Sequence, residues 1–299
     1  MSHSDPPFLV TVHPYPSPTP RSYAYELGAP SSARRNALVF IGGLGDGPHT
    51  VPYIRSIAKK LEAAADLSYS VFEIRLTSSF AGFGFSSLKK DVQEISALVK
   101  YLRSIGKQKV VLMGHSTGCQ DCVEYADENY QNEPVDGSIM QGTVSDKEAI
   151  SKIMSKEEQE ASVAFAAQLI ASGRANDIMP RDKLPSDFTT PVTAYRWHSL
   201  AGVGGDDDFF SSDLPDEKLA AVWGRFSKPV LILPSAEDEH VPKSIDVEKM
   251  IGKWKTFCAP GIASELSGLI PGASHTVPQS ESQKWISEQV AAFLQQLEK

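Results

Sequence analysis

Residues 110–118 read Val-Val-Leu-Met-Gly-His-Ser-Thr-Gly, so four apolar residues run directly into the pentapeptide Gly-His-Ser-Thr-Gly. A short apolar run of this kind predicts a buried strand, and residues 119–130 after it predict a helix. A serine at such a strand-to-helix turn lies in strained backbone, with its hydroxyl exposed above the sheet edge. Gly114 and Gly118 are needed because side chains there would collide with the neighbouring strand and helix. We therefore predict that Ser116 is a nucleophile; an ordinary polar serine in a tight turn is the alternative.

The composition excludes several classes of protein. With 299 residues and 41% hydrophobic residues, the chain can bury one large α/β core or two small ones. The net charge of −8 and the lack of a Lys/Arg stripe argue against nucleic-acid binding. The N-terminal residues lack the pattern of a signal peptide, and no stretch approaches 18 consecutive apolar residues. We expect a cytoplasmic protein with no membrane partner; the oligomeric state is left open.

Three cysteines do not make a disulfide framework. Cys119 and Cys122 form a Cys-x-x-Cys pair, but they follow the serine turn and fall one turn apart on the expected helix. We interpret them as small buried hydrophobic residues rather than as a redox or zinc site. No metal site is predicted.

Apolar strands alternate with amphipathic helices along most of the chain, which predicts a mostly parallel sheet with helices on both faces. The alternation stops for almost ninety residues after the sixth strand. We interpret this insert as a cap over the carboxyl edge of the sheet, where ligands bind in such folds. The predicted core is 1–144 with 226–299, and the cap is 145–225. Strands are expected at 8–12, 23–25, 37–41, 69–76, 110–113, 137–141, 230–233 and 267–270, and helices at 51–65, 87–104, 119–130, 146–172 and 280–297.

A serine nucleophile requires a base to accept its proton and a carboxylate to orient that base. The strand at 230–233 runs into a loop with three acids, Glu237, Asp238 and Glu239, any of which would stand at the carboxyl edge of the sheet. His275 lies in a loop of small residues just before the final helix, where the base is expected. A structural loop histidine is the alternative. The remaining histidines precede the nucleophile, lie in the cap or belong to the acid loop.

Negative charge that develops on a substrate oxygen requires fixed hydrogen-bond donors. The backbone N–H of Thr117, directly after the nucleophile, is one candidate. We expect the second from the loop after the 37–41 strand, where Gly42 and Gly43 allow close approach and Leu44 presents its N–H. The same loop lacks the Gly-x-Gly-x-x-Gly spacing of a dinucleotide cradle, so no nucleotide cofactor is expected.

With its serine turn, acid loop, histidine loop and glycine loop, the chain resembles an α/β-hydrolase over nearly its whole length. More narrowly, it resembles the fungal siderophore (fusarinine C) esterase family. An Asp followed closely by Val-Pro is usual in the acid loop of the superfamily, so the resemblance places the acid on Asp238, the nucleophile on Ser116 and the base on His275. The motifs that carry the narrower resemblance are residues 40–47, 82–88, 100–103, 114–118, 120–121, 195–196 and 206–214.

The resemblance implies hydrolysis of ester bonds in a ferric cyclic hydroxamate inside the cell, which linearises the siderophore and helps release its iron. Such an esterase uses no metal or organic cofactor, and its partner is a small-molecule ester. Fusarinine C carries free amines, so Asp206, Asp207 and Asp208 form a candidate cation-facing run that binds substrate. A solvated loop or a helix N-cap before Pro215 is the alternative.

Two rival functions remain open. The first is a different serine hydrolase activity, such as a carboxylesterase, lactonase or thioesterase, because a cap and its pocket set specificity independently of the triad. The second is a non-catalytic α/β-hydrolase relative that acts as a binding protein. The presence of all three candidates, Ser116, Asp238 and His275, argues against the second.

Overall fold

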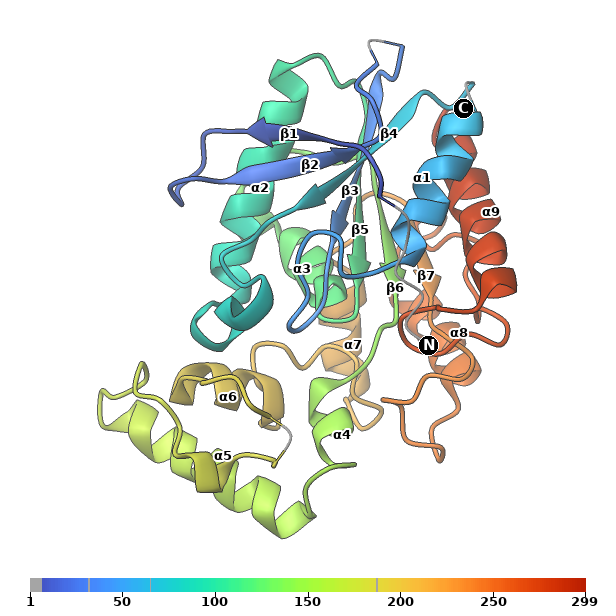
Figure 1. Cartoon of the computed structure of the whole chain (residues 1–299). Coiled ribbons are helices and arrows are strands. Elements are labelled where there is room, and N and C mark those ends of the chain that lie inside the picture. The colour runs from blue at the N-terminus through green and yellow to red at the C-terminus, as the bar shows by residue number, and fades with distance from the viewer. Residues whose placement is uncertain (1–6, 32, 65, 187) are drawn as a thin grey trace.

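A mixed sheet forms the centre of the protein (Figure 1). The structure is a computed structural model that describes residues 7–31, 33–64, 66–186 and 188–299. Within these residues the sheet has seven strands in the order β1-β2-β4-β3-β5-β6-β7. The first two pairings, β1 with β2 and β2 with β4, are antiparallel, and all others are parallel, as predicted. The strands are β1 (Val10–Pro14), β2 (Tyr23–Leu27), β3 (Asn36–Ile41), β4 (Tyr69–Ile74), β5 (Val110–His115), β6 (Gly137–Gln141) and β7 (Val230–Leu233).

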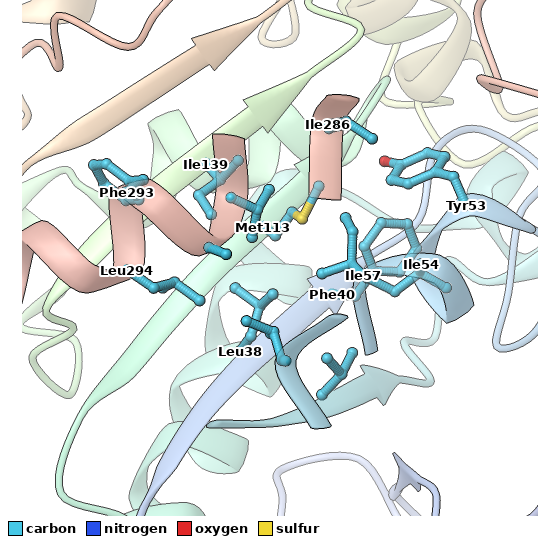
Figure 2. Close-up of a cluster of buried hydrophobic side chains, with 14 of the residues drawn as sticks. Leu38, Phe40, Tyr53, Ile54, Ile57, Met113, Ile139, Ile286, Phe293 and Leu294 are labelled. Carbon is cyan, nitrogen blue, oxygen red and sulfur yellow. The ribbon is translucent and has the colours of Figure 1, made fainter. Parts of the chain in front are cut away.

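Helices cover both faces of the sheet, because its central strands are apolar on both sides. Alternate side chains of β3 enter different hydrophobic clusters: Leu38 and Phe40 pack on one face, and Val39 and Ile41 on the other. Helices α1 (Tyr53–Ala63) and α9 (Ser280–Gln296) supply the first cluster, which Figure 2 shows. Helix α2 (Leu88–Ser104) supplies the second, and α3 (Gly118–Tyr125) packs beside it.

The periodic pattern in residues 87–104 is confirmed as a helix with a defined start. The side chain of Ser87 accepts the backbone N–H of Lys90, which satisfies a donor that the first turn of α2 leaves free. The predicted apolar face is buried along the whole helix: Leu88, Val92, Ile95, Leu98, Val99 and Leu102.

The first part of the insert after β6 differs from the prediction. A single helix over 146–172 is wrong, because the structure has α4 (Asp146–Ile150) and α5 (Lys156–Ala171) with a break between them. The reason is a capping box: the Ser155 side chain accepts the N–H of Glu158, whose carboxylate accepts the N–H of Ser155. In Figure 1, α4, α5 and α6 (Ala194–Ala201) lie below the sheet, on the side where β6 ends.

The end of the insert packs with the core. Helix α7 (Asp216–Trp223) contacts α8 (Val247–Phe257), and the rings of Trp223 and Trp254 stack with centroids 5.0 Å apart. Neither α6, α7 nor α8 was expected from the sequence. The division into core and cap at 145 and 225 stays a prediction. Three 3₁₀ helices complete the described elements: η1 (Phe80–Phe85), η2 (Glu128–Tyr130) and η3 (Arg181–Lys183).

The predicted eighth strand at 267–270 is wrong. The segment runs beside β7 but makes only isolated bridges, such as the one between Ser235 and Ile270. The Ser267 hydroxyl accepts the N–H of Ile232 at 3.0 Å, in the place where a strand neighbour would offer a carbonyl. The segment nevertheless follows β7 and delivers residues 271–278 to the end of that strand. Across the described residues, no helix is long and apolar enough to cross a membrane.

Candidate active site

The turn between β5 and α3 is strained as the sequence predicts. Ser116 has φ of +54°, a left-handed conformation that costs a non-glycine residue about 1–2 kcal/mol. A Cβ on Gly114 would overlap the backbone of Gly118, and one on Gly118 would overlap the carbonyl oxygen of Ile41. The backbone N–H of Ser116 donates to the carbonyl of Gln141 at 2.9 Å, which ties the turn to the end of β6. The residues around Ser116 therefore hold its unfavourable backbone in place.

The glycine loop after β3 lies directly against the candidate nucleophile. A Cβ on Gly43 would stand 2.6 Å from the Cβ of Ser116 and 3.2 Å from its Oγ, so only glycine permits this approach. Asp46 holds the loop, because its Oδ2 accepts the Gly43 N–H at 2.9 Å and its Oδ1 accepts the Thr50 hydroxyl at 2.8 Å. Leu44, the next residue, and Thr117 line one small cavity beside this contact. Their role as oxyanion donors stays a prediction.

The acid loop and the histidine loop meet at the ends of β7 and the segment beside it. His275 Nδ1 lies 2.7 Å from Asp238 Oδ2, and both side chains are buried, with 7% and 2% of their surface exposed. The second Asp238 oxygen accepts the N–H of His240 at 3.0 Å. Burial alone would raise the pKa of Asp238, but the hydrogen bond and charge of His275 and the His240 N–H together hold this pKa below its usual value. Asp238 is thus built to stay ionised beside the imidazole.

The two neighbouring acids take different positions. Glu239 Oε2 accepts the backbone N–H of His275 at 2.8 Å, so it supports the loop and not the ring. Glu237 is exposed, and its own N–H donates to the carbonyl of Ala273. Of the three acids that the sequence left open, the structure brings Asp238 to the His275 ring.

Gly142, the residue after β6, connects the histidine to the nucleophile turn. It has φ of +66°, and a Cβ there would stand 3.1 Å from His275 Cε1 and 3.7 Å from the backbone nitrogen of Ser116. The ring and the turn therefore lie against the same small residue. The structure brings together Ser116, His275 and Asp238, which are 37 to 159 positions apart in the chain.

Sequence reasoning missed the side chains that support the histidine. Gln141 donates from Nε2 to the carbonyl of His275 at 3.1 Å, and its Oε1 accepts the Tyr53 hydroxyl at 3.0 Å. The rings of His115 and His240 lie 4.9 Å and 4.6 Å from that of His275. Burial lowers the pKa of His115 to about 4, so this ring is neutral at physiological pH. In the sequence, the polar Gln141 at the end of an otherwise apolar strand is the signal that could have indicated this supporting role.

The acidic run of the cap makes contacts within the protein. Asp206 is exposed and accepts the Tyr195 hydroxyl at 2.5 Å. Asp207 is buried and pairs with Arg196 Nη1 at 2.5 Å. Asp208 is also buried; it accepts the Gly204 N–H at 3.2 Å and a serine hydroxyl. Asp207 and Asp208 therefore do not face open solvent as a cation-facing run would. That the run binds substrate stays a prediction that these contacts do not test.

Neither the cysteine pair nor the other described residues form a metal-binding group. Cys119 and Cys122 are buried free thiols whose pKa burial raises well above its usual value. Among the residues the structure describes, no three His, Cys, Asp or Glu side chains are grouped so that they would hold a metal ion. The thiols lie where small apolar side chains would lie.

Comparison with known proteins yields a family and several relatives. The family described as "Protein of unknown function (DUF1749)" matches residues 1–295. A UPF0613 protein of Schizosaccharomyces pombe is 34% identical over 319 residues, and the match covers 98% of each chain. The fusarinine C esterase sidJ of Aspergillus fumigatus is 29% identical over 332 residues, covering 92% of this chain and 93% of that protein.

Solved structures are also similar to this chain. The siderophore hydrolase EstB from Aspergillus fumigatus superposes with a TM-score of 0.81 at 28% identity, covering 97% of this chain and 98% of that one. A monoglyceride lipase variant from Saccharomyces cerevisiae superposes with a TM-score of 0.60 at 14% identity, covering 97% and 96% of the two chains, which shows the fold alone. The fold is the α/β-hydrolase fold.

Proposed function

This chain belongs to the DUF1749 family and is an ester hydrolase, and we propose that it works through a Ser116–His275–Asp238 triad with an acyl-enzyme intermediate. The observation that carries the proposal is the buried 2.7 Å contact between His275 Nδ1 and Asp238 Oδ2, beside a serine in a strained turn. Both the ring and the turn lie against Gly142, so the three side chains share one small region.

The chemistry follows from these positions. The Ser116 hydroxyl attacks the ester carbonyl while His275 Nε2 accepts its proton, and Asp238 keeps the other ring nitrogen protonated and stabilises the imidazolium. The N–H groups of Leu44 and Thr117 stabilise the oxyanion of the tetrahedral intermediate. His275 then protonates the departing alcohol. In the second half of the reaction His275 accepts a proton from the water that attacks the acyl-enzyme, and it returns this proton to Ser116 Oγ as the acid is released.

For the substrate we propose a hydroxamate siderophore such as fusarinine C, whose cleavage inside the cell would linearise it and help release iron. The names of two relatives support this class: a fusarinine C esterase at 29% identity and a siderophore hydrolase at 28% identity. The alternative is a carboxylesterase, lactonase or thioesterase on another small substrate. A non-catalytic binding role is disfavoured by the complete set of three side chains.

A covalent probe tests the nucleophile first. We expect a fluorophosphonate to label the wild-type protein and the surface control Ser104→Ala, and to leave Ser116→Ala unlabelled. Mass spectrometry of ferric fusarinine C and of simple esters after incubation then identifies the substrate. Labelling of Ser116→Ala would overturn the triad; cleavage of simple esters with intact fusarinine C would overturn the siderophore and leave the triad in place.

A further inference from the structure

A small polar cavity lies beside the candidate oxyanion donors. Its walls include Leu44 and Thr117 on one side and Asp91, Asp121 and Arg196 on another. The cavity volume is about 20 Å³, which is room for one water-sized group, since a single water needs roughly 10–15 Å³. An ammonium head has a similar size and offers three hydrogen-bond donors.

The charges around this cavity do not balance. Among the residues that the structure describes, Arg196 is the one cation that lines it; its Nη1 is already paired with Asp207 at 2.5 Å, while its Nε donates to the carbonyl of Phe83. Asp91 and Asp121, each 4% exposed, are then left without a cation of their own. Two buried carboxylates in excess over cations are unfavourable unless they hold protons or meet a positive group.

One of these carboxylates is also incompletely hydrogen-bonded. Asp91 Oδ1 accepts the Ser86 hydroxyl at 3.0 Å. Asp121 Oδ1, in contrast, is buried and has no hydrogen-bond partner among the residues the structure describes. A buried oxygen of this kind destabilises the folded protein unless a donor reaches it. The cavity that Asp121 lines is the place from which a donor would come.

The pKa shifts of the two acids agree with this excess of negative charge. Burial raises the pKa of Asp91 to about 7 and, together with the charges of Asp91 and Asp207, raises that of Asp121 well above its usual range; Arg196 opposes both shifts. The acids therefore hold protons when no cation is near. A cation in the cavity would favour their ionised forms.

We propose that this cavity is an acyl-side subsite that takes a primary ammonium group of the substrate, an inference that rests on the proposed esterase function. Leu44 and Thr117 line it, so a group inside it lies next to the carbonyl that the candidate nucleophile attacks. The described side chains offer no metal-binding group here, and a water molecule supplies donors but no charge. An ordered water only is the rival outcome.

Matched esters test the proposal on the whole protein. The substrates are ethyl esters of ω-amino acids with three to six carbons, and ethyl esters of the straight-chain acids of equal length. We expect kcat/KM for the amino ester to exceed that for its alkyl partner at least tenfold at one chain length. Asp121→Asn should lower this ratio at least tenfold, and Asp91→Asn should lower it in the same direction. Asp182→Asn, a cap carboxylate with 77% of its side chain exposed, should keep the wild-type ratio.

A second measurement needs neither turnover nor a variant. We expect n-alkylammonium ions to protect Ser116 from fluorophosphonate labelling at concentrations at least tenfold lower than the matching n-alkanols. Equal protection by both, or an amino-to-alkyl ratio near one at every length, would show an ordered water only and overturn the subsite. If the probe labels no serine and no ester is cleaved, the proposed esterase function itself has failed, which is a separate result.

Discussion

Buried carboxylates lie near Ser116 in two groups, Asp238 in one and Asp91 with Asp121 in the other, and their pKa values shift in opposite directions. Asp238 has 2% of its side chain exposed, yet its pKa is lowered, because His275 and a backbone N–H meet its oxygens. Asp91 and Asp121 are 4% exposed, and burial raises their pKa values; nearby acids add to this rise, and Arg196, which is already paired with Asp207, offsets it only in part. Burial by itself would raise the pKa of all three acids. The neighbours therefore decide in which direction each pKa finally shifts.

The largest effect is expected from neutralising Asp238. Asp238→Asn should lower kcat on a simple ester by about 10⁴-fold, because an amide no longer holds the correct ring tautomer or stabilises the imidazolium. Initial rates at saturating ester measure the change. Glu237→Gln, which neutralises an exposed acid one residue away, is the control and should stay near wild type. A greater loss in Glu237→Gln would reverse the assignment of the triad acid.

Removing Arg196, the arginine near Asp91 and Asp121, should destabilise the fold. Arg196→Met leaves Asp207 buried without its 2.5 Å partner, and breaking a buried pair in this way costs about 3–5 kcal/mol. Urea unfolding gives the free energy of unfolding. The control is Arg174→Met, which removes an exposed pair with Asp177 and should cost at most about 1 kcal/mol. Equal losses in both variants would mean that Arg196 and Asp207 are not a buried pair in solution.

The contrast in pKa also predicts how stability depends on pH. The folded state keeps the Asp91 proton up to about pH 7, whereas the unfolded chain releases it near its ordinary pKa of 3.8. This acid therefore contributes stability that is lost as pH rises through 7, by about 3 kcal/mol between pH 5 and 8. Asp238 acts in the opposite sense, since its contribution is lost as pH falls below its unfolded pKa.

Urea unfolding at pH 5 and pH 8 checks this prediction. The fall in unfolding free energy between the two values should be smaller in Asp91→Asn than in the wild type. An unchanged fall would show that Asp91 does not hold a proton in the folded protein.

The smallest effect is expected from the acid that supports the histidine loop. Glu239→Gln keeps a side-chain oxygen for the His275 N–H, so the loss should be about 1 kcal/mol, or roughly fivefold in kcat. The same rate assay measures it beside Asp238→Asn. A loss as large as that of Asp238→Asn would mean that the charge of Glu239, and not its hydrogen bond, matters to the ring.

Much of the framework was predictable because its signals are local. The apolar run before Ser116, the glycines around it and the helix after it lie within a few residues of one another, and the sheet order places the acid and histidine loops at strand ends. Of the two errors, one arose where distant groups decide. Ser267 takes a hydrogen bond from Ile232, so 267–270 does not form a strand. The other was a missed local signal, because the capping box of Ser155 and Glu158, three residues apart, divides residues 146–172.

The residues alone predict the strained serine turn and the loops that carry His275 and the three competing acids, since strand, turn and helix preferences depend on near neighbours. Only the folded chain shows that Asp238 is the acid at the ring, that Gln141 holds the histidine loop, and that Asp207 belongs to Arg196. The physical reason is that ionisation and hydrogen bonding depend on groups brought together from distant segments. Asp121 Oδ1 has the same origin: it finds no hydrogen-bond partner among the described residues and lines the cavity that Leu44 and Thr117 also line.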